Sequence, residues 1–300
     1  MLTIAVSSRS LFHIEDGNHI FETQGQAAFD AYMREREDLP LRPGAAFPLV
    51  KKLLALNQLR DPKLPKGVEV VMLSRNSPDA GMRAMNSVQH YGLDIERAVF
   101  CKGADRFRYA RALGAHLFLS ANAADVKAAV DFGIAAATLR PAEEDDHFRD
   151  SEVRIAFDGD SVLFSSEADE CYRANGLDAF RQHEVDRASI PLGAGPFKAA
   201  LQALHELQQT LPKDKSAMRV ALVTARGMPA HSRVIKTLRA WGIEVDEGIF
   251  AAGAPKGRLL EAFAADIFFD DTMKNITSAE QHNVLSGHVP YGHGGIVATA

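Results

Sequence analysis

The chain of 300 residues repeats itself at an offset of about 150 residues. Four segments match in the same order: residues 3–10 with 154–161, 70–76 with 220–226, 99–106 with 249–256, and 117–121 with 267–271. Four short matches in one order, at a nearly constant offset, are difficult to obtain by chance. This feature constrains the fold more than any other, and it predicts a duplicated unit with one copy in each half of the chain.

Short apolar runs alternate along the chain with longer segments of helical periodicity. Buried strands are predicted at residues 2–6, 68–73, 116–119, 154–157, 219–224 and 266–269, and helices at 47–57, 80–90, 196–208, 231–241 and 258–264. This alternation is typical of a parallel sheet covered by helices on both faces. We therefore predict the α/β class, with two tandem Rossmann-like units at residues 1–148 and 149–300. The charged, proline-bearing stretch 140–151 is the predicted boundary.

The two copies differ in the charged residues at their matched positions. The second half has Asp158, Asp160, Lys256, Asp270 and Asp271 where the first half has Ser7, Arg9, Arg106, Ser120 and Ala121. The carboxyl ends of parallel strands form the edge at which open α/β sheets bind ligands, so the acidic set is expected to gather at one edge. We predict that the chemistry lies in the second half and that the first half is a degenerate copy.

Composition excludes several classes of protein. The 46% hydrophobic and 24% charged content is ordinary for a globular protein, and a net charge of -5 gives no reason to expect a nucleic acid polymer as partner. Cys101 and Cys171 lack the spacing of metal ligands, which favours a reducing compartment, the cytoplasm. The start of the chain is typical of a strand, and no apolar run approaches the ~20 residues of a membrane span. No membrane partner is expected.

A series of polar residues follows the strands of the second half. Residues 157–160 are Phe-Asp-Gly-Asp, a later strand ends in Thr224, Lys256 follows Gly-Ala-Pro, and another strand ends in Asp270 and Asp271. This series resembles the phosphatases of the haloacid dehalogenase-like superfamily. Over nearly its whole length the chain resembles the cytosolic type I 5′-nucleotidases, in residues 5–9, 157–160, 223–226, 253–257, 268–271 and 288–292. The resemblance implies Mg²⁺-dependent hydrolysis of nucleoside 5′-monophosphates such as AMP or IMP.

The resemblance also implies a role for each acidic residue. Asp158 would attack phosphorus and form an aspartyl-phosphate. Asp160 would protonate the ester oxygen and then activate water. Mg²⁺ would be held by Asp158, by the carbonyl of Asp160 and by Asp270 or Asp271, and we favour Asp271 for direct contact.

Further residues of this half would surround the phosphoryl group. Lys256 would neutralise the charge that builds on the phosphoryl oxygens. Thr224 and the backbone N–H groups near Gly159 and Ala225 would hold those oxygens. Two interpretations of Arg226 stay open, a contact to phosphate and a surface ion pair.

The segment 161–217 is longer than a simple crossover between strands. Its stretches 164–175 and 177–187 could form a small helical cap over the site, where a base and a ribose would be recognised. Phe164, Phe180 and His183 could stack on a purine or could only pack the cap onto the sheet. The packing interpretation is favoured for each of the three.

Other functions remain open. The runner-up enzyme is a phosphatase for another small phosphomonoester, and the non-enzyme alternative is a nucleotide-sensing protein, which would need no nucleophile. Asp160 argues against a dehalogenase, because halide departure needs no proton donor. A phosphonate-cleaving enzyme would need a Schiff-base lysine, for which only Lys198, Lys213 and Lys215 are candidates. The sequence leaves base and sugar preference undetermined and is compatible with a homo-oligomer.

The degenerate half keeps polar residues at its strand ends. Ser7, Arg9, Ser74 and Arg106, with Ser8 and Arg75, form a set of hydroxyl and guanidinium groups that could bind a phosphate without metal. We hypothesise an effector or product nucleotide site there. The alternative is an inactive copy kept as a structural platform.

Overall fold

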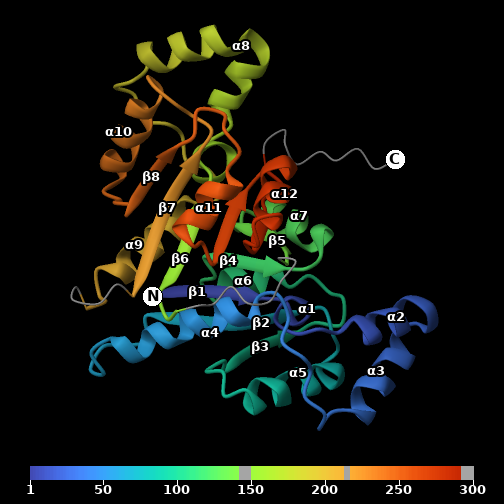
Figure 1. The fold of residues 1–300 in the computed structure, drawn as a ribbon. Helices are drawn as coiled ribbons and strands as arrows, with labels where there is room; N and C mark the ends of the chain where they lie inside the picture. The colour runs from blue at the N-terminus through green and yellow to red at the C-terminus, as the bar shows by residue number, and fades with distance from the viewer. Residues whose placement is uncertain (142–149, 213–216, 292–300) are drawn as a thin grey trace.

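The computed structural model describes residues 1–141, 150–212 and 217–291 and contains the predicted strands (Figure 1). The strands are β1 (Leu2–Val6), β2 (Val68–Ser74), β3 (Arg97–Phe100), β4 (Leu117–Ser120), β5 (Ala136–Arg140), β6 (Val153–Phe157), β7 (Met218–Thr224), β8 (Glu247–Phe250), β9 (Ile267–Asp270) and β10 (Ser286–His288). The predicted domain boundary lies largely outside the described residues, as do Lys213 and Lys215.

Helices connect these strands. They are α1 (Ser8–Leu11), α2 (Glu15–Gln24), α3 (Gln26–Glu35), α4 (Phe47–Ala55), η1 (Leu56–Leu59), α5 (Pro78–His90), α6 (Phe107–Ala112), α7 (Ala123–Asp131), the turn η2 (Gly159–Leu163), α8 (Glu167–Asp186), α9 (Lys198–Gln208), α10 (His231–Trp241), α11 (Gly257–Phe263) and α12 (Met273–Glu280). None of the helices within the described ranges is long and apolar enough to cross a membrane.

The ten described strands form one sheet in the order β3-β2-β1-β4-β5-β10-β9-β6-β7-β8. Neighbouring strands are parallel except at the centre, where β5 and β10 pair antiparallel. Gly287 of β10 lies at this seam, and a Cβ atom there would come within 2.6 Å of the Phe269 ring and 2.9 Å of the Ala137 side chain. The two halves are therefore joined edge to edge through a backbone contact that a larger side chain would disturb.

The two half-sheets have the same strand order and register. β1 lies between β2 and β4, and β6 lies between β7 and β9. Each pair of residues in the first half has an equivalent pair about 150 residues later. Leu2 pairs with Val68 as Val153 pairs with Met218, and Ile4 pairs with Leu117 as Ile155 pairs with Ile267. The sequence repeat is thus also a repeat of hydrogen-bonding pattern.

Helices cover both faces of the sheet, as the α/β prediction requires. One face packs α6 and α7 on the first half and α11 and α12 on the second, in two separate apolar clusters. On the other face a single cluster runs across both halves and includes Leu53 of α4, Phe157 of β6 and Leu204 of α9. This continuous core binds the two half-sheets to each other.

The predicted cap segment contains two different helices. α9 belongs to the core, because Ala200, Leu201 and Leu204 form a buried apolar stripe that contacts β1. α8 extends beyond the strand ends of the second half (Figure 1). It bends at Gly176, which has φ +80°, and Gly25 with φ +84° makes the matching bend between α2 and α3 in the first half. Any cap over the site is therefore α8.

Candidate active site

Three carboxylates meet where β6 and β9 end. Asp158 follows β6, Asp270 ends β9 and Asp271 comes next, and Phe157 pairs with Phe269, so the two strand ends are adjacent. One carboxylate oxygen from each aspartate lies within 4.8 Å of the others, and all three residues are buried. The structure therefore brings together the three acidic residues that the sequence placed at strand ends.

Lys256 lies inside this carboxylate cluster. Its Nζ is 2.7 Å from Asp158 Oδ1 and 2.7 Å from Asp270 Oδ2, and its side chain is only 1% exposed. Although burial alone disfavours the charged form, the carboxylates of Asp158 and Asp270 raise the pKa of Lys256. The ammonium group therefore stays charged, as a role in neutralising phosphoryl oxygens requires.

One ammonium group does not balance three carboxylates. Burial, and then the charge of Asp270, raise the pKa of Asp158 well above its ordinary value, although Lys256 opposes the shift. Burial, with a contribution from Asp270, raises the pKa of Asp271 to about 7. The cluster thus holds excess negative charge away from water, and an oxygen-only donor set of this kind fits a hard divalent cation.

Asp270 is held by more partners than its neighbour. Its oxygens accept hydrogen bonds from the Thr272 backbone N–H (2.8 Å) and from Asn275 Nδ2 (3.0 Å), in addition to Lys256. The Asp271 carboxylate contacts the Thr272 hydroxyl at 3.4 Å. Asn275 escaped the sequence analysis, although its place in the first turn of the helix after Asp270 could have indicated it.

Asp160 is turned toward Arg226. Arg226 Nε and Nη2 donate to the two carboxylate oxygens of Asp160, each at 2.7 Å. The Asp160 side chain is therefore not part of the carboxylate cluster, in keeping with a metal contact through its carbonyl only. Arg226 is 3% exposed, so the surface ion pair that we considered is wrong, and the ion pair is a buried one.

The Asp160–Arg226 pair continues into a buried chain of alternating charges. Arg226 also donates to Glu184 of α8, and the other oxygen of Glu184 accepts from Arg233 Nη1 of α10 at 2.9 Å. Arg233 then reaches Glu167 at 3.4 Å. This charge chain connects α8 to the loop that carries Asp160. No sequence pattern indicated these ion pairs.

Replacing Glu184 by Gln is expected to lower the free energy of unfolding by about 3 kcal/mol, because two buried guanidinium groups lose their shared counter-charge. Asp178→Asn is the control on the same helix, since the Asp178 side chain is fully exposed and should change stability by less than about 0.5 kcal/mol. Urea-induced unfolding of both variants measures the difference. Equal losses would contradict a structural role for the charge chain.

The predicted phosphate-binding backbone lies beside the cluster. Thr224 Oγ1 accepts a hydrogen bond from the Arg226 backbone N–H, and the Gly159 N–H donates to Asp158 Oδ1. A Cβ atom on Gly159 would come within 3.3 Å of Thr224 Oγ1. Gly159 and Thr224 therefore approach each other closely, and Ala225 follows on the same loop.

The three residues considered for stacking on a base have different surroundings. Phe164 is fully buried with its ring 5.4 Å from Trp241, so it packs the core, as the packing interpretation has it. His183 lies 3.3 Å from Glu184 and 3.5 Å from Glu167, beside the charge chain. The Phe180 ring lies 5.5 Å from the Arg226 guanidinium, which itself contacts Asp160.

The parallel sheet with Asp158, Lys256 and Asp270 at its strand ends is consistent with the haloacid dehalogenase-like class of phosphatases. The model of the 5′-nucleotidase family matches residues 1–295, and the chain belongs to this family. Human "Cytosolic 5'-nucleotidase 1B" is 39% identical over 295 residues, which is 96% of this chain and 48% of that protein. The chain thus spans about half the length of this curated relative. No solved structure matches the chain.

Proposed function

We propose that the chain is a Mg²⁺-dependent 5′-nucleotidase that hydrolyses nucleoside 5′-monophosphates to nucleoside and phosphate. The observation that carries the proposal is the buried cluster of Asp158, Asp270 and Asp271 around Lys256, at the strand ends of a member of the 5′-nucleotidase family. Because the human relative is named as cytosolic, we propose the cytoplasm as the compartment.

The oxygen atoms at the cluster indicate which residues would hold the cation. Asp158 and Asp271 offer buried carboxylates, and the Asp160 carbonyl offers a further oxygen. Asp270 is engaged by Lys256, Thr272 and Asn275, which supports Asp271 as the direct ligand. When bound, Mg²⁺ supplies positive charge to the phosphoryl oxygens.

The protein residues perform the bond changes. Asp158 attacks phosphorus, the ester bond to the nucleoside oxygen breaks, and an aspartyl-phosphate forms. Asp160 gives its proton to the departing oxygen and later takes one from the water that cleaves the aspartyl-phosphate. Both Asp160 oxygens accept hydrogen bonds from Arg226 in this structure, so proton transfer requires at least one of these bonds to open.

The proposal also gives the two halves different roles. Residues 149–300 would carry catalysis, and residues 1–148 would be the non-catalytic copy. α8 would cover the leaving nucleoside, with Phe180, whose ring lies 5.5 Å from the Arg226 guanidinium, as its aromatic contact.

Phosphate release from a panel of nucleoside monophosphates and sugar phosphates tests the function. We expect release from AMP or IMP with Mg²⁺, a fall of at least about 100-fold in EDTA, and recovery when Mg²⁺ is restored. Release confined to sugar phosphates would replace the nucleotidase with another phosphomonoesterase. No release from any compound would favour the nucleotide-sensing alternative.

A further inference from the structure

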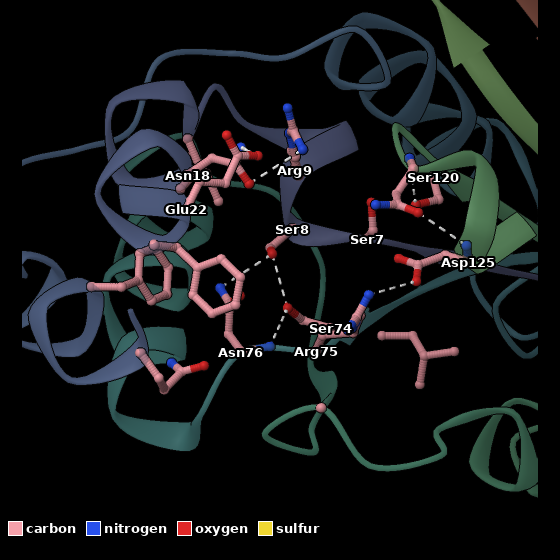
Figure 2. Close-up of a pocket in the computed structure, with 17 residues that line it drawn as sticks. Ser7, Ser8, Arg9, Asn18, Glu22, Ser74, Arg75, Asn76, Ser120 and Asp125 are labelled. Carbon is pink, nitrogen blue, oxygen red and sulfur yellow. Dashed lines mark hydrogen bonds and ion pairs between the residues drawn. The ribbon is translucent and has the colours of Figure 1, made fainter. Parts of the chain in front are cut away.

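A cavity of about 260 Å³ lies in the first half, at the strand ends of β1, β2 and β4 (Figure 2). Ser7, Ser8, Ser74 and Ser120 line its floor, and Ile14, Phe21 and Phe29 line the side formed by α2 and α3. Its volume is near the lower end of the range for small-molecule sites. Of the four residues predicted for an effector site, Ser7, Arg9 and Ser74 line it, whereas Arg106 does not.

This cavity occupies the position that the carboxylate cluster has in the second half. Ser7 N–H donates to the Leu119 carbonyl at 2.9 Å, as Asp158 N–H donates to the Phe269 carbonyl at 2.8 Å. Ser74 Oγ accepts from the backbone two residues on at 3.2 Å, and Thr224 does the same at 3.2 Å. The backbone framework of a phosphate site is therefore kept, while the side chains differ.

The negative charge at the strand ends of the second half is absent from the first. The first half has hydroxyls at the positions of Asp158 and Asp270. Arg75 and Arg106 both contact one carboxylate, that of Asp125, at 3.4 and 2.6 Å. Arg106 is buried, and among the described residues its Nε has no hydrogen-bond partner. Together Arg75, Asp125 and Arg106, which does not itself line the cavity, leave one positive charge in excess at this end, while Glu22 balances Arg9 among the other lining residues. An anion can bind there without a metal.

The hydroxyl groups lie beside Arg75, whose guanidinium is directed at Asp125 in this structure (Figure 2). Ser8 and Ser74 lie 2.9 Å apart, and Figure 2 shows Ser8, Ser74 and Asn76 grouped beside Arg75. Arg75 is 53% exposed and its contact to Asp125 is long, at 3.4 Å, so its guanidinium can turn toward a ligand when that contact opens. Arg9 is less available, because Glu15 accepts from its Nε and Nη2 at 3.1 and 2.8 Å.

The other side of the cavity is suited to a flat aromatic group. Phe21 and Phe29 meet edge to face with ring centroids 6.2 Å apart, and Phe21 remains 45% exposed. The amides of Asn18 and Gln26 line the same side; Asn18 contacts Arg9 and Glu22, and Gln26 donates to Asp30, so a base would exchange these contacts for hydrogen bonds to its own edge. An anion end and an aromatic end in one cavity match a phosphorylated nucleoside.

We propose that this cavity binds a nucleoside 5′-monophosphate without a metal ion. The phosphate contacts the hydroxyls of Ser8 and Ser74 and the guanidinium of Arg75, and the base lies against Phe21. The site stands on the geometry of the first half, and only the choice of a nucleotide over other phosphorylated aromatics rests on the proposed function.

Calorimetric titration of AMP into the full chain in EDTA tests the site, because turnover is stopped and no cation offsets the carboxylate cluster. We expect one AMP per chain, and Arg75→Ala should weaken binding at least tenfold through loss of a charge-assisted hydrogen bond. Arg108→Ala is the charge-matched control, since Arg108 is exposed, lies outside the cavity and donates only to Tyr109 among its described contacts. The affinity of Arg108→Ala for AMP should equal that of the unaltered chain.

Phe21→Ala tests the aromatic end separately. It should weaken AMP binding while leaving competition by inorganic phosphate unchanged. Absence of AMP binding in EDTA, or binding that Arg75→Ala leaves intact, would overturn the site. Mg²⁺-dependent phosphate release, measured on the same preparations, reports on the proposed function independently.

Discussion

Replacing Asp158 by Asn is expected to reduce phosphate release by at least about three orders of magnitude while the protein stays folded. The amide keeps the shape of the side chain but cannot attack phosphorus, so no aspartyl-phosphate forms. Lys256 keeps its contact with Asp270, and the crowding of buried negative charge is relieved. Initial rates of release from AMP with Mg²⁺, with thermal unfolding alongside, measure both effects.

Asp131→Asn is the matched control for this variant. Asp131 is an exposed carboxylate of α7 that pairs with Lys127, far in sequence from the carboxylate cluster. The same chemical change there should leave release within about twofold, because exposed ion pairs contribute little. Comparable rates for Asp158→Asn and the unaltered chain would remove Asp158 from the mechanism.

Replacing Lys256 by Met is expected to lower the free energy of unfolding in EDTA by about 3 kcal/mol. The methionine fills similar space but leaves Asp158 and Asp270 buried without their counter-charge, which is costly when one partner of a buried pair is removed. A divalent cation would replace part of that charge. Mg²⁺ should therefore stabilise Lys256→Met more than it stabilises the unaltered chain.

Urea-induced unfolding of Lys256→Met and of the unaltered chain, each with EDTA and with Mg²⁺, gives the four free energies of unfolding to be compared. Lys274→Met is the control, because Lys274 is exposed on the neighbouring α12 and its loss should change neither stability nor the Mg²⁺ effect by more than about 0.5 kcal/mol. If Mg²⁺ stabilises Lys256→Met and the unaltered chain equally, the cation does not bind beside Lys256. Phosphate release by Lys256→Met should also fall about 100-fold or more.

Six strands (β1, β2, β4, β6, β7 and β9) were predicted from the sequence, whereas the edge strands β3 and β8 and the two strands of the central seam, β5 and β10, were not. β1, β2, β6 and β7 are predominantly apolar runs with one polar residue near the start of each, which is typical of buried parallel strands. β3 and β8 lie at the two edges and are half-exposed, and β10 is Ser-Gly-His, with no apolar side chain to indicate a strand. Because the seam depends on β10, the joining of two half-sheets into one sheet had no sequence signal.

In the site, too, features set by neighbouring residues could be predicted, and contacts between residues far apart in the sequence could not. The residues of the carboxylate cluster could be identified because each follows a strand, and strand ends meet at one edge. The Asp160–Arg226 contact joins residues 66 apart in sequence, and the partner of Arg226 depends on how α8 folds back. Phe164 follows the turn η2 directly, and the hydrogen bond from its N–H to the Gly159 carbonyl accompanies a return of the chain into the core. This return explains why the ring packs the core, as the favoured interpretation had it, and does not reach toward a base.

The antiparallel pairing of β5 and β10 makes the strands of the two halves run in opposite directions. At the seam the carboxyl end of each half-sheet therefore lies beside the amino end of the other, so the cavity at Ser74 and the cluster at Asp158 are at different places on the sheet. The residues that line the cavity all come from the first half, so a ligand bound there as we propose would leave the carboxylate cluster open to a second one.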